Sequence, residues 1–496
     1  MILNIFILLA FSLLNATIIH IPADYPTIQE GIDASVDDDT VLIAQGIYYE
    51  NLILEKEIVL ASHAINDDLG SDWLNNENIT GTIISGAQPS DPKKGSGLII
   101  RDGDIQPEII GLTFQDGTGT AMVDSGCEDD IVLYERSGGA ILMYKAYPTI
   151  KYNRFINNGH GTDNVRSSKG NQRGGAMGLY NDDDVEFDED RNNASQNDNQ
   201  DNNPTRDIPE TLNIQNNYFE NNASGDGVNF YSQGYEGSID ISHSIFEDID
   251  CETNKVNDFV LRSIEDEADF IQNDISGNCI ETSTFYVSPG IGDDNSEGTE
   301  SDPFKTIGHA LTLVKDVGTV TTINLSWGIY SPSNNGEIFP IVLPDNVHLI
   351  GANMIWTKLD AEADEENQAA VMIIKEVENV RVVNMTLTGG SSEGHGCTGG
   401  GGLLITANDM WDFGGPMTIT NVEIENVIVE DNYSFHGAGV SLMRVNGVDL
   451  KNVIINQNTA THDGGGMYLY KSNPTLTHVT ILDNTCNTGG WGGGMT

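Results

Sequence analysis

Carboxylates in tight groups are the side chains of this sequence best suited to chemistry. Asp182, Asp183 and Asp184 stand together in a long acidic stretch. Asp293 and Asp294 form a second group much later in the chain. Carboxylate oxygens are the ligands that Ca²⁺ prefers, although neither group has EF-hand spacing, which needs a Gly at a set position and a distal Glu. We therefore treat these five aspartates as candidate Ca²⁺ ligands, and no other cofactor is indicated.

Basic residues close to acidic ones are a second kind of candidate. An Arg or Lys can remove the proton beside a uronate carboxylate whose charge Ca²⁺ neutralises. Arg136, Lys151 and Arg154 are the candidate bases. The acidic residues nearest to them in the sequence are Asp124, Glu128, Asp129 and Asp130. A solvated charged surface accounts for the same residues, so no catalytic residue is assigned.

The charge balance excludes two classes of partner. The 496 residues include 75 Asp and Glu against 23 Lys and Arg, for a net charge of -52. Nucleic acids and anionic membrane surfaces are bound through clustered Lys and Arg, which this composition barely supplies. A strong net charge keeps an exported protein dissolved and apart from its copies. We expect a monomer that does not bind nucleic acid.

The amino terminus indicates export. Residues 1–16 read MILNIFILLAFSLLNA, an apolar run that is too short to span a bilayer comfortably and that ends at a small residue. We predict a signal peptide over residues 1–16, the alternative being a buried first strand. No later apolar stretch is long enough to span a membrane, so we expect a secreted or cell-surface protein without membrane insertion.

The five cysteines are scattered and have no CxxC spacing, so a structural zinc site of cysteines is not indicated. Cys251 and Cys279 are the closest two in the sequence. In an exported protein they are candidates for a disulfide, although spacing alone does not fix the pairing.

A repeat of fixed length is the strongest pattern in the sequence. Asn432, Asn458 and Asn484 recur every 26 residues, and an apolar residue stands three positions before each. Steps of consecutive glycines recur with them. The other repeated turn and ladder positions are Gly138, Gly139, Asn158, Gly174, Gly175, Asn222, Gly464, Gly465 and Gly466. Such self-similarity is typical of solenoids.

Within each unit, short segments alternate apolar and polar residues, as in residues 476–481. This is the periodicity of strands, separated by Gly and Asn turns. One unit of this kind cannot bury its apolar face alone, whereas stacked units can, each strand pairing in parallel with its counterpart. Asn side chains at equivalent turns can then form a ladder of amide hydrogen bonds. The sequence predicts an all-β, right-handed parallel β-helix.

Two capping segments predict two such solenoids in tandem. Residues 25–34 combine a capping box at Thr27 and Glu30 with Ile28 and Ile32 on one helical face. A similar segment restarts at residues 303–311. The predicted organisation is a first β-helix over 17–265, a junction over 266–283 and a second β-helix over 284–496, which we expect to be truncated within a repeat. The acidic, Asn-rich stretch 181–207 is too polar to be buried and is expected to be a projecting loop.

These repeats resemble the pectin-lyase-like superfamily of right-handed β-helices across the whole mature chain. The segment from Tyr286 to Ile307 is similar to an amino-terminal module of exported bacterial β-helix proteins. The GGAI step at Gly138 and the FINN element at Phe155 resemble repeats of the polymorphic outer-membrane proteins of chlamydiae, which are surface adhesins.

Three enzyme families of this superfamily offer motifs to compare. Residues 46–51 (GIYYEN) resemble the GxYxE motif of pectin methylesterases, and the GHG tripeptides at 159–161 and 394–396 match that of polygalacturonases. The other motifs that carry catalytic carboxylates in those families are missing. Pectate lyases require a basic residue near Ca²⁺. In this sequence, such a site is suggested only by the closeness of Arg136, Lys151 and Arg154 to acidic residues along the chain. The GHG tripeptides fall at turns of the repeat, where a structural role suffices.

The sequence therefore predicts a non-catalytic, exported β-helix that presents loops for adhesion or glycan binding. Its expected partner is an extracellular glycan or a surface protein. The alternative is a polysaccharide lyase or glycoside hydrolase acting on acidic glycans. That alternative requires a groove holding at least three carboxylates, or a Ca²⁺ site beside an Arg or Lys, since the fold alone hosts many activities.

Overall fold

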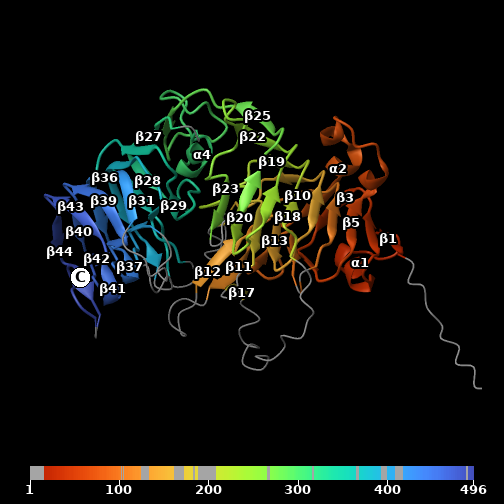
Figure 1. Cartoon of the computed structure of the whole chain (residues 1–496), viewed down its shortest axis with the longest axis horizontal. Coiled ribbons are helices and arrows are strands. Elements are labelled where there is room, and N and C mark those ends of the chain that lie inside the picture. The colour runs from red at the N-terminus through yellow and green to blue at the C-terminus, as the bar shows by residue number, and fades with distance from the viewer. Residues whose placement is uncertain are drawn as a thin grey trace, which may run out of the picture.

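The structure, a computed structural model, forms two adjoining stacks of β-coils (Figure 1). It describes residues 16–101, 103, 105–124, 133–160, 173–181, 185–187, 208–264, 268–315, 318–364, 368–392, 399–407, 417–487 and 490–496. Strands β1 to β25 build the first stack and β26 to β45 the second. Within the described residues, no sheet contains strands of both stacks.

The first stack has long sheets that run along its axis, with strands in the following spatial order. One sheet contains β1 (Ile18–Ile21), β2 (Thr40–Ile43), β5 (Val59–Ser62), β9 (Glu108–Ile110) and β14 (Thr149–Lys151). A second contains β25 (Ser276–Cys279), β22 (Ile245–Ile249), β19 (Tyr218–Glu220), β15 (Arg154–Ile156), β10 (Thr113–Gln115), β6 (Thr82–Ser85) and β3 (Gly46–Tyr49). A third contains β23 (Leu261–Ile264), β20 (Phe230–Gln233), β16 (Met177–Tyr180), β13 (Ile141–Tyr144), β8 (Leu98–Ile100) and β4 (Leu52–Leu54).

Smaller elements complete this stack. A short sheet contains β18 (Thr211–Asn213), β21 (Ser238–Asp240) and β24 (Asp269–Ile271). An antiparallel sheet is formed by β12 (Leu133–Ser137), β11 (Gly119–Asp124), β17 (Val185–Phe187) and β7 (Lys94–Gly95). The helical elements within the described residues of this stack are α1 (Ile28–Ala34), η1 (His63–Asn66), η2 (Trp73–Asn75) and α2 (Glu77–Gly81).

The described residues of the second stack form three sheets, and helix α4 (Ile307–Thr312) follows the first strand. The largest sheet contains β26 (Thr284–Val287), β27 (Thr321–Leu325), β30 (Val347–Gly351), β33 (Val380–Thr388), β36 (Met417–Glu430), β39 (Val445–Lys451) and β43 (Asn473–Thr477), with β28 (Gly328–Tyr330), β31 (Thr357–Asp360), β40 (Ile454–Asn456) and β44 (Thr480–Leu482) joined to it. The next contains β29 (Ile341–Val342), β32 (Met372–Lys375), β35 (Leu403–Thr406), β38 (Val440–Met443) and β42 (Met467–Tyr470). The third contains β34 (Ser391–Ser392), β37 (Tyr433–His436), β41 (Thr459–Asp463) and β45 (Thr485–Cys486).

Strand pairing between successive coils is parallel throughout both stacks. Val440 of β38, for example, pairs with Leu403 below it and Met467 above it. Among the described residues, only the pairs made by β11 and two isolated bridges are antiparallel. The predicted all-β parallel β-helix is therefore confirmed. Its strands alternate apolar and polar residues, and because successive side chains point to opposite faces of a strand, the apolar ones point inward.

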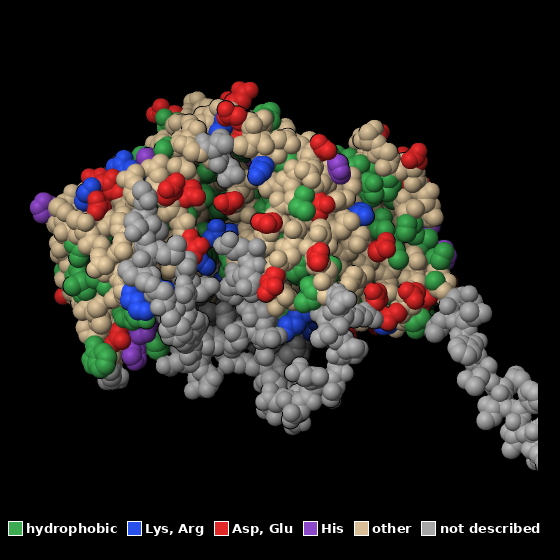
Figure 2. Space-filling model, viewed as in Figure 1, with side chains coloured by type: hydrophobic (Ala, Val, Ile, Leu, Met, Phe, Trp, Pro, Cys, Tyr) green, Lys and Arg blue, Asp and Glu red, His purple; other side chains and the backbone are tan. Residues whose placement is uncertain are grey.

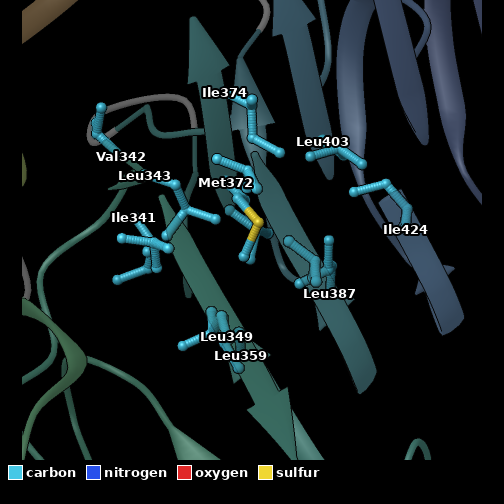
Figure 3. Packing of buried hydrophobic residues seen from close by; sticks show 14 of the residues in the cluster. Ile341, Val342, Leu343, Leu349, Leu359, Met372, Ile374, Leu387, Leu403 and Ile424 are labelled. Carbon is cyan, nitrogen blue, oxygen red and sulfur yellow. The ribbon is translucent and has the colours of Figure 1, made fainter. Parts of the chain in front are cut away.

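The interior of each stack is filled by the inward-pointing apolar residues of these strands. Figure 3 shows this packing in the second stack, where Leu349, Leu359 and Leu387 come from strands of one sheet and approach Met372 from another. In the first stack, phenyl rings are stacked along the axis from coil to coil. Their order is Phe114, Phe155, Phe219 and Phe246.

Asparagine ladders run along the interior at the turns. The backbone N–H and the side-chain Nδ2 of Asn432 both donate to Oδ1 of Asn458, at 3.1 and 3.0 Å. Asn458 repeats the arrangement toward Asn484 at 3.0 Å. In the first stack Asn158 donates in the same way to Asn222. Each buried amide thus satisfies backbone groups that a turn leaves without strand partners.

Side chains from later coils hold the amino-terminal ends of both capping helices. The carboxylate of Glu50 accepts from the N–H groups of Ile28 and Gln29 at the start of α1, each at 3.0 Å. Buried Glu337 accepts in the same way from Ile307 and Gly308 of α4, at 2.7 and 3.0 Å. A carboxylate at a helix amino terminus satisfies N–H groups that have no partner inside the helix.

The pKa of Glu337 gives the second stack a testable pH dependence. Burial raises this pKa to about 7, against the opposing effect of the two N–H donors. The pKa of Glu337 is higher in the folded protein than in the unfolded chain, so the protonated side chain stabilises the folded state. This contribution is complete below about pH 4.5 and is lost as the pH rises toward 7. We expect the free energy of unfolding of the wild type, relative to Glu337→Gln, to fall by about 2 kcal/mol between pH 5 and 8.

Denaturant titrations of both proteins at several pH values measure this difference. Glu50→Gln, which alters the matching carboxylate of α1, is the control for losing such a cap. If the free energy of unfolding changes with pH in the same way in the wild type and in Glu337→Gln, the prediction is wrong.

The two stacks meet where α4 lies, near the middle of the molecule (Figure 1). Asn257 of the first stack donates to the carbonyls of Leu311, Thr312 and Val314 at the carboxyl end of α4, at 2.7–3.2 Å. Phe259 also packs into the apolar cluster of the second stack. The first stack therefore covers the open end of the second, as a solenoid end requires.

Cys251 and Cys279 are joined by a disulfide, as expected from their closeness in the sequence. The bond connects the turn after β22 with the end of β25. Among the described residues, no helix is long and apolar enough to cross a membrane.

Candidate functional site

A groove of about 640 Å³ lies in the second stack, beside the start of β37. Its walls combine carboxylates and an aromatic ring with small residues. The lining residues are Ala363, Asp364, Gly389, Gly390, Ser391, Asp431 and Tyr433. They come from three successive coils, so only the stacking of coils brings them together.

The floor of the groove is bare backbone held in place by the asparagine ladder. Oδ1 of Asn432 accepts from the N–H of Gly390 at 2.9 Å, and the carbonyl of Gly390 accepts from the N–H of Tyr433 at 2.8 Å. Gly389 has a φ of +69°, and a Cβ there would lie 2.1 Å from Oδ1 of Asp360. A larger residue at this position would therefore collide with Asp360 and take up a backbone conformation that favours glycine.

The polar groups of the groove suit a ligand rich in hydroxyls. Asp431 occupies the turn between β36 and β37 with a φ of 56°, and Asp364 follows β31. Ionised carboxylates accept hydrogen bonds from hydroxyl groups. Half-buried Tyr433 opens β37 and adds an apolar ring with a polar tip. Few polar groups in a concave site fix the orientation of a small ligand.

Asp293 and Asp294, the two predicted Ca²⁺ ligands that the structure describes, do not line this groove. Asp294 accepts from the N–H groups of Lys305 and Thr306 at 2.8 and 2.9 Å, and Asp293 accepts from the N–H of Asn295 at 3.0 Å. They brace the turn that leads into α4. Asp182, Asp183 and Asp184 lie outside the described residues. Ca²⁺ binding by either group stays a prediction.

The candidate bases lie at separate places. A guanidinium nitrogen of Arg136 donates to the carbonyls of Pro92 and Gly119, at 2.7 and 3.1 Å. The guanidinium of Arg154 lies 5.6 Å from the ring centroid of Tyr218. Lys151 belongs to β14, in a different sheet from Arg154 of β15. The acidic residues at 128–130 lie outside the described residues, and so does the side chain of Asp124.

The motifs that resemble enzyme signatures lie at structural positions where they are described. Glu50, the acidic residue of GIYYEN, caps helix α1. His160 of the first GHG tripeptide makes a hydrogen bond between Nε2 and the carbonyl of Asn221 in the next coil, at 2.8 Å. The remainder of that tripeptide, Gly161, and the whole second tripeptide, 394–396, lie outside the described residues.

A carboxylate surrounded by cations is found where the stacks meet. Burial raises the pKa of Asp226, against the opposing charges of Arg262, Arg173 and Lys375. Nε of Arg262 lies 4.0 Å from a carboxylate oxygen of Asp226. Both side chains are largely buried. This burial leaves the cluster little surface for a large substrate.

Sequence reasoning missed the groove residues Asp364, Asp431 and Tyr433. For Asp431 the sequence offered one signal, namely its position directly before the ladder residue Asn432. The equivalent residues of the next two coils, Gln457 and Asp483, share its positive φ. The residue before each ladder asparagine is therefore a turn position whose side chain is free to vary.

Comparisons with known proteins give a family match for part of the chain. Residues 290–492, within the second stack, match the family described as "Protein of unknown function (DUF1565)". No curated protein matches the chain.

The solved structures that match this chain are distant from it in sequence and in TM-score. The tailspike protein gp49 from Acinetobacter baumannii bacteriophage Fri1, a capsular polysaccharide depolymerase, is 10% identical at a TM-score of 0.23, over 94% of this chain and 62% of the tailspike. A mannuronic acid specific polysaccharide family 6 lyase from human gut microbiota is 10% identical at a TM-score of 0.19, over 95% and 87%. The family 28 exopolygalacturonase of Yersinia enterocolitica is 9% identical at a TM-score of 0.19, over 96% and 79%. Likeness at this level does not extend to activity or substrate.

Proposed function

We propose that the protein is an exported β-helix that binds an extracellular glycan of low charge in the groove beside β37. The observation that carries this proposal is the groove itself. Two carboxylates and a tyrosine ring surround a floor of glycine backbone. Sugar hydroxyls donate to carboxylates, and the apolar face of a sugar ring packs on an aromatic side chain.

The charge of the protein favours a neutral glycan over a polyuronate. Figure 2 shows acidic side chains spread over the visible face of both stacks. Asp364 and Asp431, which line the groove, are two of the carboxylates behind the net charge of -52. A polyanionic chain would be repelled by this field unless cations intervened. We therefore replace the acidic substrate class, considered from sequence alone, with uncharged glycans.

Tyr433→Ala tests the proposal by removing the ring without altering the net charge. We expect a loss of binding of about tenfold, which corresponds to roughly 1.4 kcal/mol. Affinity electrophoresis in gels containing neutral glycans or polyuronates, with and without Ca²⁺, measures the change. Tyr470→Ala, on the neighbouring sheet, is the matched control. Equal retention of Tyr433→Ala and the wild type in every retarding gel would overturn the assignment of this groove.

A hydrolase is the second candidate, because Asp364 and Asp431 line one groove. Glycoside hydrolases use two carboxylates on either side of the scissile bond. New reducing ends in the glycan that the groove binds, lost in both Asp364→Asn and Asp431→Asn, would favour hydrolysis. Binding without new reducing ends would favour the non-catalytic function.

A further inference from the structure

A cluster of nitrogen and oxygen donors lies at the carboxyl ends of β37 and β41. It consists of His436, His462 and Asp463. Each offers one ligand atom, and the three atoms lie within 4.8 Å of one another. Nδ1 of His462 lies 3.0 Å from Oδ2 of Asp463, and Nδ1 of His436 lies 3.8 Å from the same oxygen. Two neighbouring coils contribute, because His436 ends β37 whereas the other two end β41.

We propose that this cluster binds one divalent transition-metal ion of the zinc class. Zinc bonds to imidazole nitrogen and carboxylate oxygen are about 2.0–2.2 Å long, which places neighbouring ligand atoms of a tetrahedron about 3.3 Å apart. The two nitrogen–oxygen separations, 3.0 and 3.8 Å, lie on either side of that value. Two imidazoles favour zinc or its neighbours over Ca²⁺ and Mg²⁺, which prefer oxygen ligands.

An unpaired buried nitrogen indicates that a ligand is needed here. Nδ1 of His436 is buried and finds no hydrogen-bond partner among the described residues, since 3.8 Å to Asp463 exceeds hydrogen-bond length. A buried polar atom without a partner costs about 1–3 kcal/mol. A metal ion between the imidazole and the carboxylate would satisfy this atom, whereas the direct pairing leaves it unsatisfied.

The surroundings prepare these donors for a metal. The other carboxylate oxygen of Asp463 accepts from the N–H of Trp491 at 2.7 Å, which leaves Oδ2 facing the imidazoles. The ring of His436 is stacked on Tyr468 with a centroid distance of 4.7 Å, and the ring of His462 is stacked on Phe435 at 5.1 Å. Contacts of this kind fix the orientation of metal-binding side chains.

His462 is about half exposed, so a fourth ligand position would face solvent and hold water.

Titration calorimetry of ZnCl₂ into full-length protein, freed of metal by dialysis against a chelator and of any purification tag, tests the proposal. We expect one ion per chain and a rise in the melting temperature with zinc, because the ion binds only the folded site. Affinity should fall by at least about tenfold in His462→Gln and Asp463→Asn. Co²⁺ bound at this site should give the visible absorption of a tetrahedral complex.

Three control variants distinguish this site from zinc binding elsewhere on the chain. His478→Gln, at an exposed turn of the same stack, and Cys486→Ser, which removes a nearby thiol, should both bind zinc like the wild type. Tyr433→Ala should also bind zinc normally, so failure of the glycan proposal would leave this one standing. Melting curves without metal show whether each variant folds. Wild-type zinc affinity in folded His462→Gln, or no stoichiometric binding by the wild type, would overturn the proposal.

Discussion

Replacing Phe219 with alanine is expected to destabilise the first stack by about 3–5 kcal/mol. The Phe219 side chain is 1% exposed, and its ring is stacked between those of Phe155 and Phe246, with centroid distances of 5.2 and 4.8 Å. Alanine would leave a cavity in the middle of this column. Neighbouring rings cannot collapse into it without disturbing the parallel pairing of β15, β19 and β22, which sets the spacing between coils.

Urea denaturation followed by hydrogen exchange measures this effect and locates it. Exchange should accelerate most in β15, β19 and β22, because a solenoid depends on interactions between neighbouring coils. Phe219→Leu should cost less, since leucine fills part of the cavity. Tyr49→Ala, at an exposed position of β3, is the surface control. Unchanged exchange in β19 of Phe219→Ala would contradict the importance of the column.

The second large effect is expected from Asn458→Ala, at about 2–4 kcal/mol. The side-chain amide of Asn458 donates to the carbonyls of Val429 and Asn456, at 2.9 and 3.0 Å. Its oxygen accepts from both the backbone N–H and the side chain of Asn432. Alanine would leave these buried groups without partners, and no water can easily replace an amide in a closed stack.

This variant also connects stability with the groove. Asn432 holds the N–H of Gly390 in the groove floor, so loosening Asn432 should weaken glycan binding as well as lower the melting temperature. Asn473→Ala is the matched control, because Asn473 makes a similar contact with Asn446 on the exposed surface. Equal losses of stability and of glycan binding in Asn458→Ala and Asn473→Ala would show that the buried ladder stabilises the protein no more than the exposed contact does.

The repeat makes the fold predictable from the sequence. The 26-residue spacing of Asn432, Asn458 and Asn484 reports a contact between coils directly, since residues one period apart lie above one another. The same spacing separates His436 from His462, so the meeting of these imidazoles was also readable. Sequence reasoning missed it, because a histidine beside a repeated turn does not by itself indicate a metal ligand.

The groove was not predictable for a different physical reason. Asp364 and Asp431 lie on coils of unequal length, with insertions that break the period between them. Their approach depends on how much chain each turn holds, which no spacing in the sequence reports. The carboxylate of Glu337 was missed likewise, because its role appears only once α4 is placed against the coil that follows.

The disulfide between Cys251 and Cys279 has a mechanical consequence. A force pulling on the two ends of the chain passes through this bond, so residues 252–278 carry no tension while it is intact. Asn257, which holds the carboxyl end of α4, lies within that shielded loop. Unfolding by force along the chain therefore does not pull this contact between the stacks apart directly. With a reductant present, a pulled molecule should extend further by the length of residues 252–278.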